Sequence, residues 1–213
     1  MHEAAALPLV SITAWDGLER TNVTASDHIL IHGGIGGVGH IAVQLAKVLG
    51  ARVATTVGSA DAADLARNLG ADETVLYLSE TVDHYVDRLS EGRGFDVVFD
   101  TVGGSNLGAS FAAAGDNGRV ITTNSRTTQD LGLLHAKALS FGVVFMLLPM
   151  LHGRGRDRHG RILRSLARLV DAGRVRPLID ANHFTLATAP DAHRRIESGK
   201  ATGKIVIDIA EEA

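Results

Sequence analysis

The stretch HILIHGGIGGVGHIAVQLAKVLG, residues 28–50, decides the fold of this chain. It opens with a short apolar run, continues through a glycine-rich turn, and ends in a run with helical periodicity. In that last run Ile41, Leu45, Val48 and Leu49 fall on one stripe of a helix. Gly50 follows where a helix C-terminal cap belongs. The stretch therefore predicts a strand, a tight turn and a helix in succession.

The same alternation of strand-like and helix-like segments continues along the chain. Apolar, β-branched runs predict six strands, at residues 28–32, 52–56, 73–78, 96–101, 119–123 and 142–148. Helical periodicity lies between them, with a second glycine cap at Gly70 and with Asp61 predicted as an N-cap. The basic segment 152–161, HGRGRDRHGR, is interpreted as a solvated loop.

Strands that alternate with helices are typical of a parallel sheet with right-handed crossovers. Several predicted strands are apolar on both faces, as strands buried between two helix layers must be. The sequence thus predicts an α/β fold, a doubly wound Rossmann-type parallel sheet with helices on both faces.

Composition narrows the class of protein. The 213 residues carry a net charge of −3, and aromatic residues make up 4%, which argues against a nucleic-acid partner. No apolar run reaches the length of a membrane span, and residues 1–10, MHEAAALPLV, lack the basic start of a secretory signal. There is no cysteine, which removes disulfides and cysteine-ligated zinc. We expect a cytoplasmic protein with neither a nucleic-acid nor a membrane partner.

The glycine turn carries the functional prediction. Gly34, Gly36 and Gly39 match G-x-G-x-x-G between a predicted strand and a predicted helix, the setting in which the motif binds a dinucleotide. The first glycine permits the turn, the second lets a pyrophosphate approach, and the third allows close packing of helix on strand. The helix N-terminus then offers N–H groups to the phosphates. The alternative is a glycine turn without a ligand.

The end of the second strand favours NADP(H) over NAD(H). NAD-binding versions of this motif place an acidic residue there, to hold the ribose 2′-hydroxyl. Here the strand runs into Gly58 and Ser59 with no carboxylate. The missing acid removes a repulsion against a 2′-phosphate, and the Ser59 hydroxyl offers it a donor.

With these segments in view, the chain resembles the medium-chain dehydrogenase/reductase superfamily, in its zinc-independent quinone oxidoreductase (zeta-crystallin-like) branch. The resemblance runs from AAALPLVSITAWDGL (residues 4–18) through the glycine turn and FDVVFDTVGG (95–104) to AHRRIESGKATGKIVIDI (192–209). It implies an NADPH-dependent oxidoreductase that passes a hydride to a quinone or enone acceptor.

The resemblance also implies roles for individual residues. The pyrophosphate would lie on the turn formed by Gly36, Gly37, Val38 and Gly39, and the 2′-phosphate near Gly58, Ser59, Tyr77 and Lys200. The nicotinamide half would pass Thr13, Asn124 and Phe145. Strand packing for Tyr77, core packing for Phe145, a solvated surface for Lys200 and helix packing for Thr13 remain alternatives. No residue is identified as a proton donor, so the catalytic residues stay unassigned.

Two departures from the family concern charge and metal. Ala62 stands where a lysine usually follows the Ser59 turn, which weakens the preference for NADPH without reversing it. A cysteine ligand of the zinc alcohol dehydrogenases would fall near Leu9, where this chain has none. His32 and His40 flank the glycine turn and are interpreted as structural, so we expect no metal site and no zinc.

The third departure is the largest. Members of the family carry an N-terminal GroES-like domain that forms the substrate side of the cleft, and this chain begins where that domain would end. We therefore divide the chain into a Rossmann NADP(H)-binding domain with its N-terminal helix, residues 1–176, and a C-terminal segment, residues 177–213, that would return to the GroES-like domain. On this interpretation the chain by itself has most substrate contacts missing and is inactive.

Two other classes of protein fit the same residues, and a third is disfavoured. A non-catalytic dinucleotide-binding module shares every residue discussed, as does an alcohol dehydrogenase-like enzyme whose substrate domain is missing. A short-chain reductase is disfavoured, because no Tyr-x-x-x-Lys follows the fourth strand. Finally, the apolar sixth strand, Gly142–Leu148, resembles one that pairs with its mate across a subunit boundary in this branch, so we expect a homodimer.

Overall fold

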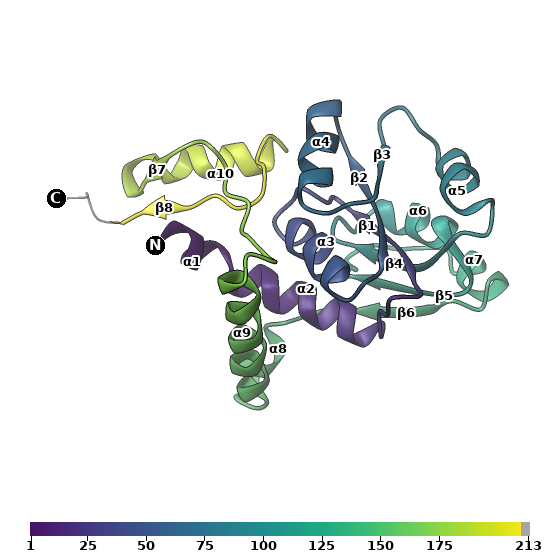
Figure 1. Cartoon of the computed structure of the whole chain (residues 1–213), viewed down its shortest axis with the longest axis horizontal. Helices are drawn as coiled ribbons and strands as arrows, with labels where there is room; N and C mark the ends of the chain where they lie inside the picture. The colour runs from purple at the N-terminus through teal and green to yellow at the C-terminus, as the bar shows by residue number, and fades with distance from the viewer. Residues whose placement is uncertain (210–213) are drawn as a thin grey trace.

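The computed structural model, which describes residues 1–209, is built on one six-stranded parallel sheet (Figure 1). The strand order is β3-β2-β1-β4-β5-β6. The strands are β1 (His28–His32), β2 (Arg52–Val57), β3 (Glu73–Leu76), β4 (Phe95–Asp100), β5 (Ala114–Thr122) and β6 (Ser140–Val143). The chain starts in the middle, winds to one edge through β3, and returns across β1 to the other edge. This doubly wound order confirms the predicted fold class.

Helices cover both faces of the sheet. Those of the main body are α2 (Pro8–Arg20), α3 (Gly39–Val48), α4 (Ala60–Asn68), α5 (Val82–Ser90), α6 (Asn106–Ala113), α7 (Gly132–Ala136) and α9 (Arg156–Asp171). Two separate apolar clusters, one on each face, result from the period-two alternation of the strands. Ile29 and Ile31 point into the cluster under α2, α3 and α4, whereas Leu30 points into the one under α5 and α6.

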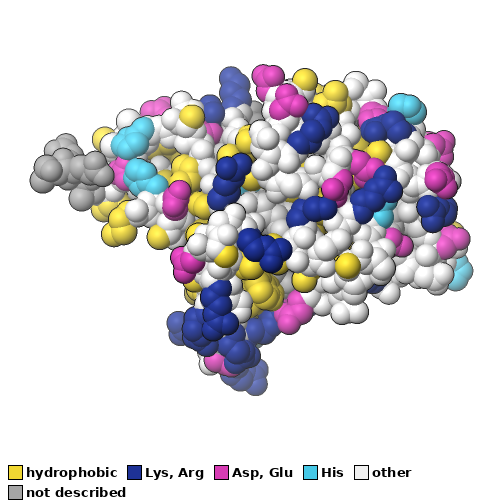
Figure 2. Space-filling model, viewed as in Figure 1, with side chains coloured by type: hydrophobic (Ala, Val, Ile, Leu, Met, Phe, Trp, Pro, Cys, Tyr) yellow, Lys and Arg dark blue, Asp and Glu magenta, His cyan; other side chains and the backbone are white. Residues whose placement is uncertain are grey.

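Four local predictions are corrected by the structure. The third strand ends at Leu76, so Tyr77 follows it rather than lying within it. The sixth ends at Val143, because Pro149 opens the short helix α8 (Leu148–Leu151) a few residues later. The basic loop is helical from Arg156 onward, since α9 begins there. Figure 2 shows Lys and Arg side chains gathered at the end of the molecule where α8 and α9 lie in Figure 1. Asp61 lies in the first turn of α4, and Ser59 is the N-cap instead.

The last part of the chain folds apart from the sheet. After α9 it forms β7 (Phe184–Thr185), the 3₁₀ turn η1 (Leu186–Thr188), α10 (Ala189–Glu197) and β8 (Ile207–Asp208), and β7 pairs with β8 in a parallel two-stranded ribbon. The short N-terminal helix α1 (His2–Ala6) lies beside this ribbon (Figure 1). Residues 210–213 of the predicted segment 177–213 lie outside the described residues.

Among residues 1–209, no helix combines the length and the hydropathy that crossing a bilayer requires.

Candidate functional site

The glycine turn joins β1 to α3 at the centre of the sheet's carboxyl edge. Thr56, near the end of β2, fixes its backbone from the side through two hydrogen bonds. The Gly33 N–H donates to the Thr56 hydroxyl at 3.0 Å, and the Gly34 N–H donates to the Thr56 carbonyl at 3.2 Å. Gly36 then donates back to the Gly33 carbonyl at 2.9 Å. These hydrogen bonds within the protein fix the backbone of the turn.

The space around each glycine separates structural from ligand-facing positions. A Cβ on Gly34 would lie 2.0 Å from the Thr55 hydroxyl oxygen, and a Cβ on Gly39 would lie 2.0 Å from the Gly33 carbonyl oxygen. Neither position has room for a side chain. A Cβ on Gly37 would meet nothing closer than Lys204 Cδ at 3.5 Å, which is ordinary contact. The fold alone therefore does not require glycine at position 37.

The turn offers unpaired donors to an anion. Within residues 1–209, the backbone N–H groups of Gly37 and Val38 donate to no protein acceptor, whereas His40 and Ala42 already donate to the carbonyls of Gly36 and Val38. These free groups precede the N-terminus of α3, which carries a partial positive charge. A cradle of free N–H groups beside a position open to a side chain fits a pyrophosphate.

Three predicted residues come together at the end of β2. Gly58 follows the strand directly, and a Cβ added to it would lie 3.3 Å from the Tyr77 hydroxyl. The Ser59 side chain accepts a hydrogen bond from the Ala62 N–H at 3.2 Å, which caps α4. Because the Ser59 hydroxyl only accepts in this bond, its proton remains available for a ligand. Tyr77 is 57% exposed, which excludes the alternative of a half-buried strand aromatic.

The other half of the carboxyl edge holds the residues predicted near the nicotinamide. Asn124 follows β5, and the Gly103 turn after β4 packs directly on it, since a Cβ on Gly103 would lie 2.2 Å from the Asn124 carbonyl oxygen. Phe145 follows β6 and is 48% exposed, so it is not a core residue. In a doubly wound sheet, ligands bind along this edge where the strand order reverses, here between β1 and β4.

Thr13 approaches the same edge from α2. Its hydroxyl donates to the Leu9 carbonyl at 2.8 Å within the helix, and the residue is buried. One turn earlier, the Val10 side chain lies 3.8 Å from the position of a Cβ on Gly37. The N-terminal half of α2 therefore borders the glycine turn, as the prediction for Thr13 requires.

A buried histidine and a buried aspartate lie at the strand reversal itself. His32 ends β1 and is in register with Asp100 at the end of β4. Burial lowers the pKa of His32 to about 4 against an opposing effect of the Asp100 carboxylate, so the imidazole is neutral at pH 7. One Asp100 oxygen accepts the N–H groups of Val102 and Gly103 at 2.9 and 2.8 Å. This pair shapes the turn after β4, which fits the structural interpretation of His32.

Sequence reasoning missed the segment that covers the glycine turn. The Gly203 N–H donates to the Ile35 carbonyl at 2.8 Å, and Lys204 lies over Gly37. Lys200, the predicted phosphate ligand, is exposed, and the structure gives its side chain no contact with Ser59 or Tyr77 within residues 1–209. The repeated Gly-Lys pairs in GKATGK pointed to this region, but spacing alone could not tell which lysine reaches the turn.

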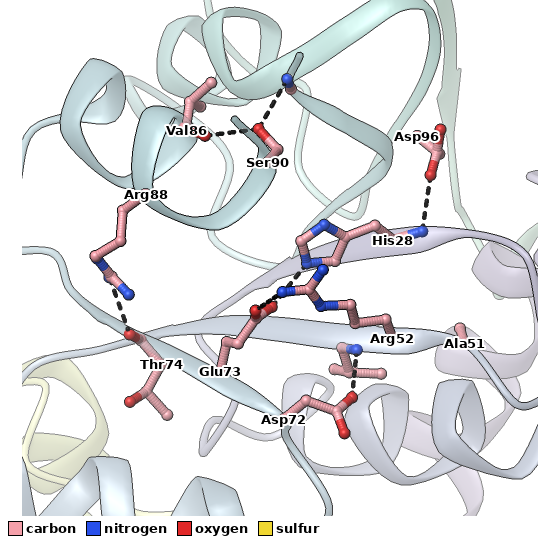
Figure 3. Close-up of polar contacts among 12 residues, drawn as sticks. His28, Ala51, Arg52, Asp72, Glu73, Thr74, Val86, Arg88, Ser90 and Asp96 are labelled. Atoms are coloured by element: carbon pink, nitrogen blue, oxygen red, sulfur yellow. Dashed lines mark hydrogen bonds and ion pairs between the residues drawn. The ribbon is translucent and has the colours of Figure 1, made fainter. Parts of the chain in front are cut away.

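A second polar cluster occupies the opposite edge of the sheet (Figure 3). Figure 3 shows the His28 ring and the Arg52 guanidinium both directed at the Glu73 carboxylate, with His28 Nε2 at 2.8 Å from it. These residues begin β1, β2 and β3. A hollow of about 510 Å³ beside His28 is lined by polar residues of the same edge. The cluster joins the first residues of three neighbouring strands. Because dinucleotides bind at the carboxyl ends of parallel strands, it lies at the edge of the sheet opposite the predicted cofactor site.

Comparison with known proteins agrees with this geometry. Residues 69–207 match the family described as zinc-binding dehydrogenase. Over 99% of its length the chain is 35% identical to the mitochondrial NAD(P)H oxidoreductase RTN4IP1 of Danio rerio, of which it covers 57%. It is 31% identical to the chloroplastic NADPH-dependent alkenal/one oxidoreductase of Arabidopsis thaliana, of which it covers 46%. The chain spans about half the length of these curated relatives.

Solved structures extend the comparison to the fold. An alcohol dehydrogenase superfamily protein from Novosphingobium aromaticivorans superposes with a TM-score of 0.92 at 36% identity, covering 99% of this chain and 64% of that one. Escherichia coli quinone oxidoreductase in complex with NADPH superposes with a TM-score of 0.86 at 26% identity, covering 97% and 65%.

Fold and site together define a dinucleotide-binding domain of the doubly wound class. More specifically, the chain belongs to the zinc-binding dehydrogenase family and is the cofactor-binding portion of a medium-chain dehydrogenase/reductase, similar to quinone oxidoreductases and alkenal reductases.

Proposed function

We propose that this chain is the cofactor-binding portion of an NADPH-dependent reductase of the quinone or enone type, which transfers hydride without zinc. The observation that carries the proposal is the cradle at Gly37 and Val38, where two unpaired N–H groups precede the N-terminus of α3 and a Cβ on Gly37 would make only ordinary contacts. Two similar proteins use or bind this cofactor: the NADPH-dependent alkenal/one oxidoreductase of Arabidopsis thaliana and the Escherichia coli quinone oxidoreductase in complex with NADPH.

The chain's own residues account for binding and orientation. Gly37 and Val38 receive the pyrophosphate, and Asn124 and Phe145 border the nicotinamide half at the ends of β5 and β6. Thr13 closes the same edge from α2. The bound nicotinamide supplies the hydride, and the protein supplies placement and exclusion of water. The described residues offer no evident proton donor, so we assign that role to none of them.

Preference for NADPH rests on the Ser59 turn. The end of β2 has no carboxylate to repel a 2′-phosphate, and the Ser59 hydroxyl proton is free to donate. The exposed Tyr77 side chain lies beside Gly58, and its hydroxyl offers a second donor. NADH is the weaker ligand on this account, because it lacks the phosphate that both hydroxyls would bind.

A quinone or enone acceptor is proposed because its conjugated carbonyl accepts hydride without a Lewis acid. The donor set agrees with that choice: the chain has no cysteine, and the family's zinc ligand position near Leu9 is apolar. The alkenal/one oxidoreductase of Arabidopsis thaliana and the quinone oxidoreductase of Escherichia coli are similar proteins with such names.

The proposal is tested by calorimetric titration of the chain with NADPH and, separately, with NADH. We expect saturable NADPH binding, at least about tenfold weaker binding of NADH, and loss of both in Gly37→Val, whose added methyl groups occupy the pyrophosphate cradle. Gly160→Val on α9 is the matched control and should bind as the wild type does. Equal binding by Gly37→Val, or stronger binding of NADH, would contradict the assignment.

A non-catalytic dinucleotide-binding module is the second candidate, because the cradle at Gly37 and Val38 supports binding while the described residues offer no evident proton donor. Supplying the GroES-like domain of a similar reductase separates the two. NADPH oxidation that depends on added quinone or enone supports the reductase, and cofactor binding without turnover supports the module.

We further propose a homodimer that pairs through β6. This strand ends the sheet on one side, and Phe141 and Val143 are 39% and 37% exposed. An apolar sheet edge invites a second strand. In sedimentation runs at micromolar concentration we expect a dimer, which Val143→Lys shifts to monomer. Leu76→Lys on the opposite edge strand, with the same 37% exposure, should leave the dimer intact. A monomeric wild type contradicts the proposal.

A further inference from the structure

Three side chains capable of binding a metal converge at the end of the molecule away from the main sheet. They are His2 on α1, His183 just before β7, and Asp208 on β8. One ligand atom from each lies within 4.8 Å of the other two. The residues come from both ends of the chain, so their convergence is a product of tertiary folding.

The ribbon explains why two of these residues share a face. Thr185 is in register with Asp208 in the parallel pairing of β7 and β8. Side chains two residues apart point to the same side of a strand, so His183 lies on the Asp208 face of the ribbon. Helix α1 packs on that face and brings His2 Nε2 to 2.5 Å from Asp208 Oδ1.

The carboxylate stands between two imidazoles. His183 Nε2 pairs with the second oxygen of Asp208, and the two rings are tilted with centroids 6.0 Å apart. The group therefore presents one anionic oxygen donor and two imidazole nitrogens.

We propose that His2, His183 and Asp208 bind a divalent transition-metal ion of the Zn²⁺ type. Two imidazoles and a carboxylate match the preferences of Zn²⁺ or Co²⁺ and not those of Mg²⁺ or Ca²⁺, which take oxygen ligands. Zinc bonds of about 2.0–2.2 Å place two ligand atoms roughly 3–3.5 Å apart. In the structure His2 Nε2 and Asp208 Oδ1 lie 2.5 Å apart, so these ligand atoms would move slightly apart to hold the ion. The side chains of His2 and His183 are 45% and 68% exposed, so both rings are free to move.

The bound ion would join the start of the chain to its end. Because the contact of His2 with Asp208 joins α1 to the β7–β8 ribbon, coordination would fix the ribbon against the N-terminal helix. The triad does not include any residue of the glycine turn or of the ends of β5 and β6. Its role is therefore separate from hydride transfer, and it does not depend on the proposed function. The proposal departs from the sequence-based expectation that the chain holds no metal site.

The test is metal binding by the chelator-treated chain without a histidine tag. We expect calorimetry to give one Zn²⁺ per chain, visible absorption to report Co²⁺ in the same site, and Mg²⁺ not to compete. His183→Gln and Asp208→Asn should each weaken Zn²⁺ binding at least about tenfold. His193→Gln, an exposed histidine on α10 in the same C-terminal segment, is the control and should bind as the wild type does.

Because all of these side chains are at least partly exposed, we expect each variant to keep the fold. Circular dichroism of each variant verifies this. The proposal is overturned if the wild type binds no Zn²⁺ up to millimolar concentration. It is equally overturned if His183→Gln and Asp208→Asn bind Zn²⁺ as tightly as the wild type, because binding would then belong to other histidines. NADPH binding is measured in the same samples and is expected to be unchanged, which keeps this test distinct from that of the cofactor site.

Discussion

Replacing Gly39 with alanine is expected to destabilise the protein strongly. The added Cβ would lie 2.0 Å from the Gly33 carbonyl oxygen and 2.8 Å from the Gly33 carbonyl carbon. Both are backbone atoms, so no rotamer change relieves the contact. The Gly33 backbone is itself fixed, because its N–H bonds to Thr56 and its carbonyl accepts from Gly36. Strand β1 and helix α3 would have to separate at the centre of the sheet.

The expected cost exceeds about 3 kcal/mol, a large part of the roughly 5–15 kcal/mol that keeps a domain folded. Urea unfolding followed by circular dichroism measures it. Gly37→Ala is the matched control, since its Cβ meets nothing closer than 3.5 Å, and its stability should stay within about 1 kcal/mol of the wild type. A Gly39→Ala protein as stable as Gly37→Ala would show that the turn can open without loss of packing.

This pair of glycines also shows what the sequence could predict. The motif, the apolar strands and the caps at Gly50 and Gly70 gave the doubly wound fold, because each depends on local chemistry and on periodicity. The motif assigns a role to each glycine, but only coordinates show that Gly39 has no room for a Cβ while Gly37 has. The backbone of the same turn, at Gly33 and Gly34, closes on Gly39, whereas the neighbours of Gly37 are Lys204, Gly203 and Val10 on other segments.

Each local feature that the sequence analysis missed or misplaced has a physical cause. Tyr77 and the residues after Val143 are apolar or aromatic, so hydropathy extended their strands, although pairing ends earlier. Ser59 caps α4 in place of Asp61, because the extended backbone at Ser59 lets its side chain reach the Ala62 N–H. The His2, His183 and Asp208 triad had no sequence signal at all, since its members meet only through the pairing of β7 with β8 and the return of α1.

The C-terminal segment depends on one buried carboxylate, and removing it is expected to release the segment. Asp180 is buried, and its two oxygens accept the Arg195 Nε at 2.9 Å each, the Asn182 side-chain amide at 2.8 Å, and the backbone N–H of Thr202 at 2.9 Å. These partners come from the loop before β7, from α10 and from the segment before β8. A single side chain thus joins three parts that the short ribbon alone does not hold.

Asp180→Ala leaves the Arg195 guanidinium without its partner and the Thr202 N–H without an acceptor. Breaking such a buried pair costs about 3–5 kcal/mol. We expect fast amide hydrogen exchange and proteolysis over residues 177–209, with the six-stranded sheet still protected. The matched control is Asp191→Ala, whose partner Arg194 is on the surface of the same helix and whose loss should cost at most about 1 kcal/mol.

The dependence on pH gives an independent measurement of the same contact. Burial pushes the pKa of Asp180 upward, but the bonds from Arg195, Asn182 and Thr202 outweigh it and place that pKa well below the ordinary carboxyl range. A depressed folded-state pKa gives stability that is complete above the unfolded value and is lost as pH falls toward the folded one. Below about pH 4 the wild-type segment should therefore lose protection, whereas Asp180→Ala should show little further change.

Loss of structure in the C-terminal segment is also expected to affect the binding of the cofactor. Gly203 and Lys204 lie over the glycine turn through the bond from Gly203 to Ile35 and the contact of Lys204 with Gly37. If the segment helps to cover a bound pyrophosphate, Asp180→Ala should weaken NADPH binding while Asp191→Ala does not. Loss of protection with unchanged affinity would mean that the turn binds the dinucleotide without its cover. Protection that survives in Asp180→Ala would mean that the ribbon and α1 hold the segment by themselves.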